Sequence, residues 1–345
     1  MEKKLTIVVP AYNMEKYLRK CLDSLILDNQ RIMNNMEVLI INDGSTDKTL
    51  EIAREFEIKI PNVFRVIDKE NGGKGSCMNL GIQMATGKYI KELDADDYFD
   101  GKAFESFLQY IYITDVDMVL TDFCIVNSQG RPKEHSRYSF PTNEVLKVDD
   151  FCDDLEFLKI KMHSVTYKVS ELRKNQFSQS EGVPYTDMEW VFLPIIYMNS
   201  FSYLPISLYN YLIGRAGQSV DISILSQKAG IRIGLLMNRI NIYTILAKQN
   251  SIVNKKLNYL RNRVLNSTFR IYRCGIVIKQ FDDSLLESFD QTLKDANLDL
   301  YKYMEVHGDP RLFGLSYIKP WRKKRKKSII VLLINIAYHF KLKFY

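Results

Sequence analysis

The sequence predicts an α/β fold in which a mostly parallel sheet is followed by a helical C-terminal region. Residues 4–93 alternate short β-branched apolar runs with segments of helical periodicity, which is typical of βαβ units. From about Ser223 the apolar residues recur at spacings of three and four, the period of an amphipathic helix. With 345 residues, 46% hydrophobic and 26% charged, the chain is long enough for a buried core and falls outside the disordered and collagen-like classes.

Four strands and three helices are expected in order along residues 4–93. The expected strands are LTIVV, EVLII, VFRVI and KYIKEL, and the helical periods between them cover residues 14–29, 46–56 and 74–85. Each strand is followed by a polar or glycine-bearing turn, at residues 11–13, 42–45, 71–73 and 94–97. Ligands of open α/β sheets bind at the carboxyl ends of the strands, so we expect these four turns to form the functional site.

Later elements are expected to be a helix near residues 102–113, a strand within 118–126 and a mixed region over 148–213. In the mixed region, HSVTYKV (163–169) is a candidate strand, and a helical period begins at Thr186. Helical stretches follow at residues 224–248, 252–279 and 285–306. We therefore expect a domain over residues 1–220, a helical region over 221–318 and a tail over 319–345.

The cysteine and histidine patterns argue against disulfides and zinc. The five cysteines are far apart and form no CxxC pair, and the four histidines form no HxxxH pair. We expect reduced thiols in a cytoplasmic setting, and a metal, if one is bound, held by oxygen atoms. The apolar run near the N-terminus is too short for the core of a signal peptide.

Positive charge is concentrated in the tail. Residues 301–345 hold 11 Lys/Arg against 2 Asp/Glu, and seven of these basic residues lie within 319–327, before an apolar run at 329–338. This run is shorter than the roughly 20 residues that cross a bilayer. The pattern, with Trp321 beside it, favours an anchor on an anionic membrane surface, and a helix docked on the body is the alternative. Because the rest of the chain is not basic, we expect no nucleic-acid partner.

The turn after KYIKEL contains three carboxylates in four residues, Asp94-Ala95-Asp96-Asp97. Carboxylates this close repel one another unless a cation neutralises them, and hard oxygen ligands suit Mg²⁺ or Mn²⁺. Mg²⁺ is commonly held by one or two carboxylates together with substrate phosphates, so the turn predicts a metal–diphosphate site. The alternative is a solvated acidic turn.

Two other turns are candidate ligand contacts. Asp43 ends a strand before a glycine, where its carboxylate could accept a hydrogen bond from a nucleobase N–H; Ser45 or Thr46 could instead cap the next helix. The glycines of Asn71-Gly-Gly-Lys-Gly75 permit a close approach of the backbone to a ligand. The chain has no P-loop ending and no GxGxxG after its first strand, which disfavours ATPase and dinucleotide-binding classes.

The order VVPAYN, EVLIINDGSTDKT, ENGGKGSCMNLG and KELDADDYF resembles the inverting glycosyltransferases of family 2, with their GT-A fold. The resemblance implies that the turn at residues 10–12 and Asp43 hold the base, usually uracil, that Asp94 contacts ribose or metal, and that Asp96 is the chief metal ligand. The nucleotide-sugar-binding residues it implies are Pro10, Ala11, Tyr12, Asn13, Asp43, Asn71, Gly73, Lys74, Asn79, Asp94, Ala95, Asp96, Arg215 and Ser219.

Two later stretches extend the resemblance. Asp187 falls where the family places its catalytic base, although Thr186 stands where the family commonly has glutamate. Thr186 and Glu189 also have the spacing of a capping box that opens a helix. Arg215 and Ser219 lie in a segment that resembles the one reaching the diphosphate, and a plain interdomain loop is the alternative. His163 is left out of the site, because a single histidine in an apolar run is more often packed in the core.

The resemblance implies a metal-dependent inverting transfer of a sugar from a UDP-sugar to a hydroxyl of a saccharide or of a lipid-linked acceptor of the cell envelope. Mn²⁺ or Mg²⁺ would be the cofactor, and the basic tail would hold the protein at the inner face of the membrane. The helical region could line an acceptor groove, form a homo-oligomer surface, or both. An inactive partner subunit and a sugar nucleotidyltransferase are the alternative functions.

Overall fold

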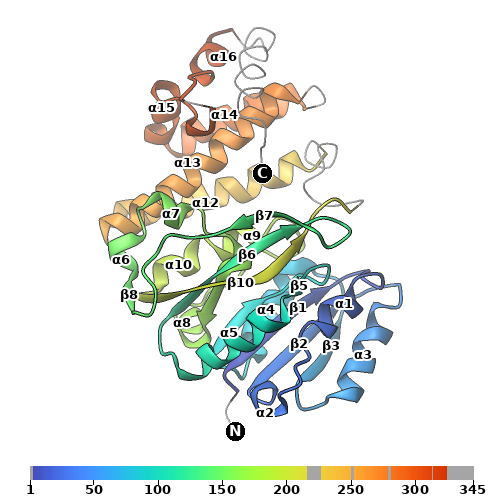
Figure 1. Ribbon diagram of the computed structural model, residues 1–345. Coiled ribbons are helices and arrows are strands. Elements are labelled where there is room, and N and C mark those ends of the chain that lie inside the picture. The colour runs from blue at the N-terminus through green and yellow to red at the C-terminus, as the bar shows by residue number, and fades with distance from the viewer. Residues whose placement is uncertain (1–2, 216–226, 250–251, 279–280, 313, 325–345) are drawn as a thin grey trace. The chain divides into compact units, whose positions relative to one another are not determined.

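The computed structural model describes residues 3–215, 227–249, 252–278, 281–312 and 314–324 (Figure 1). The chain forms two compact units, residues 1–216 and 217–345, and each is described by itself. The predicted boundary at residue 220 lies outside the described residues. The first unit is α/β and the second is helical, as the two periodicities predict.

The predicted parallel strands form one half of a single sheet. In spatial order they are β3 (Phe64–Lys69), β2 (Met36–Asp43), β1 (Leu5–Ala11) and β4 (Tyr89–Glu92). All three neighbouring pairs are parallel, with Ala11 opposite Asn42, Asp43 opposite Lys69 and Val8 opposite Glu92. Since the strands run in one direction, their carboxyl ends and the turns that follow lie at one edge, as predicted.

The other half of the sheet is mixed in direction. It contains β9 (Val165–Lys168), β6 (Met118–Val126), β10 (Ser200–Leu212) and β5 (Tyr98–Phe99), with β7 (Pro132–Ser136) beside β6 and β8 (Leu146–Lys147) beside β10. Strand β10 was not predicted. Its pairing with β6 shifts register on both sides of Ser207, and this irregularity breaks the alternation by which a strand is recognised.

Helices cover both faces of the sheet, whose central strands β1 and β2 are almost entirely buried. The helices of the parallel half are α1 (Leu18–Asp23), α2 (Gln30–Met33), α3 (Thr49–Lys59), α4 (Gly73–Met84) and α5 (Gly101–Ile113). The single helix expected over residues 14–29 is wrong: only α1 forms there. Shorter helices follow at α6 (Val148–Phe151), α7 (Leu155–Leu158), α8 (Val169–Lys174), α9 (Asp187–Trp190) and α10 (Leu193–Tyr197).

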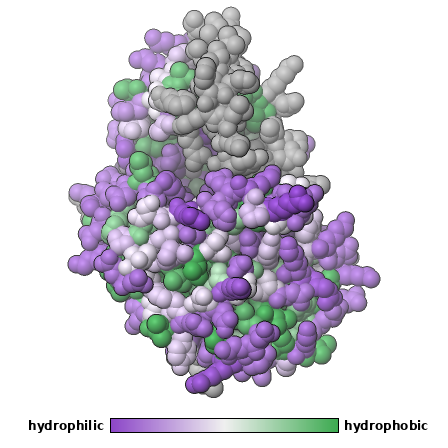
Figure 2. All heavy atoms as spheres, viewed as in Figure 1, coloured by the Kyte–Doolittle hydropathy of each residue, from purple (hydrophilic) through white to green (hydrophobic). Residues whose placement is uncertain are grey.

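Apolar side chains of α1, α3 and α5 pack on one face of β1 and β2 and form the main core with them. On the other face α4 packs close to β1: a Cβ at Gly81 would lie 2.6 Å from a methyl group of Val8. The visible face of this unit is mostly hydrophilic, with hydrophobic residues in small groups (Figure 2). Packing on both faces thus holds the central strands, and with them the turns that follow their carboxyl ends, in fixed positions.

The second unit contains α12 (Ala229–Gln249), α13 (Asn254–Val277), α14 (Asp283–Ala296), α15 (Leu298–Val306) and α16 (Ile318–Lys324) (Figure 1). The helix expected over residues 285–306 is two helices. Asn297 separates them, and its side chain accepts a hydrogen bond from the Leu300 N–H to cap α15. Propensity alone did not reveal this break, because asparagine is tolerated inside many helices.

The beginning of the predicted tail belongs to the packing of this helical unit. Helix α16 crosses the expected boundary at residues 318/319, and Trp321 is 2% exposed with its ring 5.7 Å from that of Tyr272. Arg322 donates to Asp290 Oδ1 at 2.7 Å and to the Tyr301 carbonyl at 2.8 Å. The prediction that Trp321 faces a membrane is therefore wrong, since burial and a paired guanidinium hold this segment in the core. Residues 325–345 lie outside the described residues.

None of the helices in the part of the chain that the structure describes combines the length and the apolar character needed to cross a bilayer.

Candidate active site

The turns after β1 and β2 are tied to each other. The Asn13 N–H donates to Ser45 Oγ at 3.0 Å, and the Thr46 N–H donates to Asn13 Oδ1 at 2.9 Å. Asn13 has φ +53°, a left-handed conformation that asparagine tolerates better than most residues. The alternative role of Ser45 or Thr46 as a cap of α3 is wrong, because Lys48 occupies the cap position, without a side-chain hydrogen bond. Asn13 thus holds the two turns in one arrangement.

The turn after β1 presents one aromatic ring at the sheet edge. Tyr12 is 48% exposed, whereas Ala11 is buried at the end of the strand and Pro10 is partly buried. The exposed ring of Tyr12 offers apolar surface there, and flat rings of this kind stack well on nucleobases.

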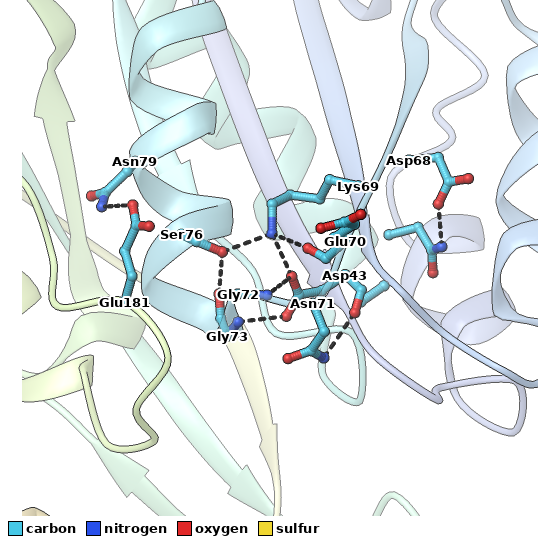
Figure 3. Close-up of polar contacts among 12 residues, drawn as sticks. Asp43, Asp68, Lys69, Glu70, Asn71, Gly72, Gly73, Ser76, Asn79 and Glu181 are labelled. Carbon is cyan, nitrogen blue, oxygen red and sulfur yellow. Dashed lines mark hydrogen bonds and ion pairs between the residues drawn. The ribbon is translucent and has the colours of Figure 1, made fainter.

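Asp43 holds the glycine loop that follows β3 (Figure 3). Its carboxylate accepts from the Gly72 N–H at 2.9 Å, the Gly73 N–H at 2.8 Å and Lys69 Nζ at 2.7 Å. The Asn71 amide donates to the Asp43 carbonyl at 2.8 Å, and Gly73 has φ +79°, where glycine alone is unstrained. Both carboxylate oxygens of this buried residue therefore already have donors from the protein, a role that the sequence did not suggest.

Asn79 and Gly75 bring the segment before Asp187 against α4. The Asn79 side chain accepts from the Gln179 N–H at 2.7 Å. It also donates to Glu181 Oε1 at 2.8 Å (Figure 3). A Cβ at Gly75 would lie 2.0 Å from the Ser180 carbonyl oxygen, so only glycine permits this approach. The sequence assigned Asn79 and these glycines to the ligand; at Asn79 and Gly75 the structure shows contacts with the chain itself.

The acidic turn after β4 contains one buried carboxylate, Asp97, and two partly exposed ones, Asp94 and Asp96. Carboxylate oxygens of Asp94, Asp96 and Asp97 lie within 4.8 Å of one another. Asp97 is 1% exposed and accepts from the Tyr209 hydroxyl at 2.6 Å and the Leu212 N–H at 2.7 Å, which ties the turn to β10. The side chain of Ala95, between Asp94 and Asp96, is buried and offers no polar group.

Lys74, at the start of α4, lies among three carboxylates. Its Nζ is 2.7 Å from Glu92 Oε1, 2.7 Å from Asp94 Oδ1 and 2.6 Å from Asp187 Oδ1. Burial opposes the charge of this ammonium, but Asp187, Asp94 and Glu92 outweigh it and raise the pKa of Lys74 well above its ordinary value. Glu92 was missed by the sequence analysis; the available signal was a charged residue inside an apolar strand run.

Asp187 opens the short helix α9 with its carboxylate 47% exposed, so one residue combines a fixed position with access to solvent. The capping box expected at this point is wrong. Thr186 makes no side-chain cap, and the Glu189 carboxylate accepts instead from the Ser180 N–H and Oγ, both at 2.7 Å. Glu189 therefore helps Gly75 and Asn79 to fix the segment that leads into Asp187.

Arg215, just beyond β10, donates from Nε to Asp96 Oδ2 at 2.5 Å. Its guanidinium lies 5.6 Å from the ring centre of Tyr17. The structure thus brings Arg215 to the acidic turn, and its contact with a diphosphate stays a prediction. Ser219, its expected companion, lies outside the described residues.

The chemistry of these side chains fits a divalent cation. Burial raises the pKa of Asp94, and the neighbouring charges of Asp187 and Asp96 add to this effect while Lys74 opposes it. Burial likewise raises the pKa of Glu92, again opposed by Lys74. Two cations, Lys74 and Arg215, face more carboxylates than they can neutralise, and the donors are all hard oxygens of the kind that Mg²⁺ and Mn²⁺ prefer.

His163 lies in the core, as its apolar surroundings predict. Its ring centre is 5.0 Å from that of Phe123, 4.8 Å from that of Tyr209 and 4.4 Å from that of Tyr211. Burial lowers the pKa of His163 well below its usual value, and nearby lysine charges add to the effect. The residue is a neutral aromatic neighbour of β10.

Residues 6–163 match the family model described as Glycosyl transferase family 2, and this part of the chain is a family 2 glycosyltransferase domain. Glycosyltransferase GlyA of Streptococcus pneumoniae is 34% identical over 131 residues, which are 38% of this chain and 18% of GlyA. Minor teichoic acid biosynthesis protein GgaB of Bacillus subtilis is 34% identical over 148 residues, 42% of this chain and 16% of GgaB. The chain thus spans less than a fifth of either relative.

The fold is similar to that of a solved structure, residues 1–349 of S. aureus TarS in complex with UDP-GlcNAc. The TM-score is 0.60 at 19% sequence identity, and the match covers 87% of this chain and 89% of the TarS chain. The first unit accordingly has the GT-A fold that the four motifs predicted.

Proposed function

We propose that this chain transfers a sugar from a UDP-sugar to a hydroxyl group of a saccharide or lipid-linked acceptor, with inversion at the anomeric carbon. One observation carries the proposal: Asp94, Asp96 and Asp187 meet two cations at the carboxyl edge of a family 2 domain. A metal–diphosphate site and a separate exposed carboxylate are the two parts that a single displacement requires.

Asp187 is the proposed general base. Its carboxylate is exposed enough to meet an acceptor, and one oxygen is held by Lys74. The other oxygen would take the proton of the acceptor hydroxyl as that hydroxyl attacks the anomeric carbon. Because the attack and the departure of UDP occur on opposite faces of the sugar in one step, the configuration inverts.

Stabilisation of the negative charge on the departing diphosphate is the second requirement. Asp94 and Asp96 would hold the divalent cation, which supplies Lewis-acid stabilisation of the diphosphate when it is bound. Arg215 would turn from Asp96 toward phosphate oxygens, since its planar fork pairs with them in two places. Arg215 would thus act on negative charge that grows on the diphosphate during the reaction.

The classes of sugar donor and acceptor are inferred from Tyr12 at the carboxyl edge of the sheet and from the relatives. Tyr12 offers a stacking surface for a base, and the TarS structure with a similar fold contains UDP-GlcNAc. The name of GgaB, a teichoic acid biosynthesis protein, supports a cell-envelope polymer as the acceptor. The remaining predicted contacts at residues 10–13, 43, 71 and 73 belong to this proposal as the frame of the base pocket.

Calorimetric titration with UDP tests the nucleotide half of the proposal. We expect UDP to bind with Mn²⁺ or Mg²⁺ and to bind much more weakly after chelation or in Asp96→Asn. Asp115→Asn is the matched control, because Asp115 is an exposed acid that pairs with Lys88 and Lys168, away from the turn. Metal-independent binding that is unchanged in Asp96→Asn would contradict the assignment of the acidic turn.

A further inference from the structure

Glu92 is a buried acidic residue at the carboxyl end of β4, which lies between β1 and β9 in the sheet. It ends β4, its side chain is 0% exposed, and it lies opposite Val8 of β1 in the parallel ladder. Its ion-pair partner is Lys74, whose Nζ lies 2.7 Å from Glu92 Oε1. A carboxylate buried in this way is costly unless its partner is held close.

Lys74 forms ion pairs with both a candidate metal carboxylate, Asp94, and the candidate base, Asp187. These two aspartates lie far apart in the sequence, one after β4 and one at the start of α9. Helix α9 has only four residues and follows Tyr185, whose φ of +72° is strained for a side chain of that size. Because α9 is so short, a contact of the Asp187 side chain itself is needed to fix the position of its carboxylate.

We propose that Glu92 is a positioning residue that holds the Lys74 ammonium between Asp94 and Asp187, and that Lys74 in turn orients the base. This inference rests on the proposed function. Glu92 is fixed by a central strand, so it places the ammonium with the precision of the sheet. Lys74 then occupies one oxygen of Asp187 and leaves the other directed to the acceptor.

The test uses a double-mutant cycle on the full chain with Glu92→Gln, Lys74→Met and the double variant. Glu92→Gln keeps the shape of the side chain and removes its charge. We expect kcat for sugar transfer to fall about 10²-fold with a much smaller change in KM for the donor, because misplacement of a catalytic group by about 1 Å has that effect. In the Lys74→Met background the same change is expected to have little further effect.

Two variants keep the result interpretable. Glu37→Gln is the matched control. Glu37 is also buried, at 8% exposure, but it lies at the beginning of β2, away from the carboxyl edge, and accepts from the Thr6 hydroxyl and the Thr86 N–H. We expect it to lower the melting temperature without the loss of kcat. Glu92→Asp keeps the charge one methylene further away, so it is expected to retain more kcat than Glu92→Gln and replaces it if the glutamine variant does not fold.

A kcat of Glu92→Gln equal to that of Glu37→Gln, or an equal loss in both Lys74 backgrounds, would overturn the proposal. If the wild-type protein releases UDP from no donor, the proposed function fails instead. The melting temperatures of the wild-type protein, Glu92→Gln, Lys74→Met and the double variant then still decide whether Glu92 acts through Lys74. Additive shifts in melting temperature overturn the link, and non-additive shifts support it.

Discussion

Replacing Asp43 by asparagine probes the frame of the nucleotide site. The side chain keeps its size, but the amide has one accepting oxygen where the carboxylate had two. Oδ1 receives the Gly72 N–H and Lys69 Nζ, and Oδ2 receives the Gly73 N–H. Whichever way the amide turns, at least one buried donor faces an N–H₂ group, and the charge that attracts Lys69 is lost.

The cost can be estimated from these contacts. A hydrogen bond to a charged group contributes about 1.5–3 kcal/mol, and weakening the ion pair with Lys69 adds roughly 1 kcal/mol, so Asp43→Asn should lower the free energy of unfolding by about 2–4 kcal/mol. For a unit of this size that corresponds to a melting temperature lower by roughly 5–15 °C. Thermal unfolding followed by circular dichroism measures it.

Asp68→Asn is the matched control for this prediction. Asp68 lies on the neighbouring strand, is exposed, and accepts one hydrogen bond, from Asn42 at 2.6 Å. It should cost less than about 1 kcal/mol. If Asp43→Asn unfolds at the same temperature as the control, the carboxylate does not hold the glycine loop and the reasoning is refuted.

Three further changes have defined outcomes. Gly75→Ala drives a Cβ against the Ser180 carbonyl and should destabilise the chain by about 1–3 kcal/mol in denaturant unfolding, whereas Gly101→Ala, which meets no atom within 4 Å, should not. Because the pKa of His163 is lowered in the folded chain, His163 takes up a proton in the unfolded chain first, and the free energy of unfolding should fall as the pH drops below about 6.5. His163→Phe should reduce the slope of the free energy of unfolding against pH by up to about 1.4 kcal/mol per pH unit. Equal slopes in the wild-type protein and the variant would contradict this account. Arg322→Met removes the guanidinium that pairs with the buried carboxylate of Asp290 in α14, which keeps its hydrogen bond from the Tyr272 hydroxyl, and should lower the free energy of unfolding by about 1.5–3 kcal/mol; unchanged unfolding would show that α16 does not dock.

The sequence was sufficient for the parallel half of the fold and for the edge where the site lies. Short apolar runs, each followed by a polar turn, need only local periodicity to be recognised, and parallel strands then bring the turns together. Asp94, Asp96, Arg215 and Asp187 meet at that edge, although their order in the chain gives no distance between them.

What the sequence did not reveal depends on contacts between distant segments. The pairing of Lys74 with Glu92 joins a helix start to a strand, and Asn79 reaches a segment 100 residues later. The capping box at Thr186 failed for the same reason: Glu189 found Ser180, a partner that local pattern reasoning does not consider. Motifs located these residues, but only the packing of α4 against the chain before Asp187 defines their partners.

UDP release from a panel of UDP-sugars, with Mn²⁺ or Mg²⁺ and a saccharide acceptor, tests the central claim most directly. We predict metal-dependent release with one donor, a loss of about 10²-fold or more in Asp187→Asn, as expected for removal of a general base, and no loss in Asp68→Asn. Release that Asp187→Asn leaves unchanged would contradict the assignment of the base. No release and no UDP binding with any donor would contradict the glycosyltransferase site itself.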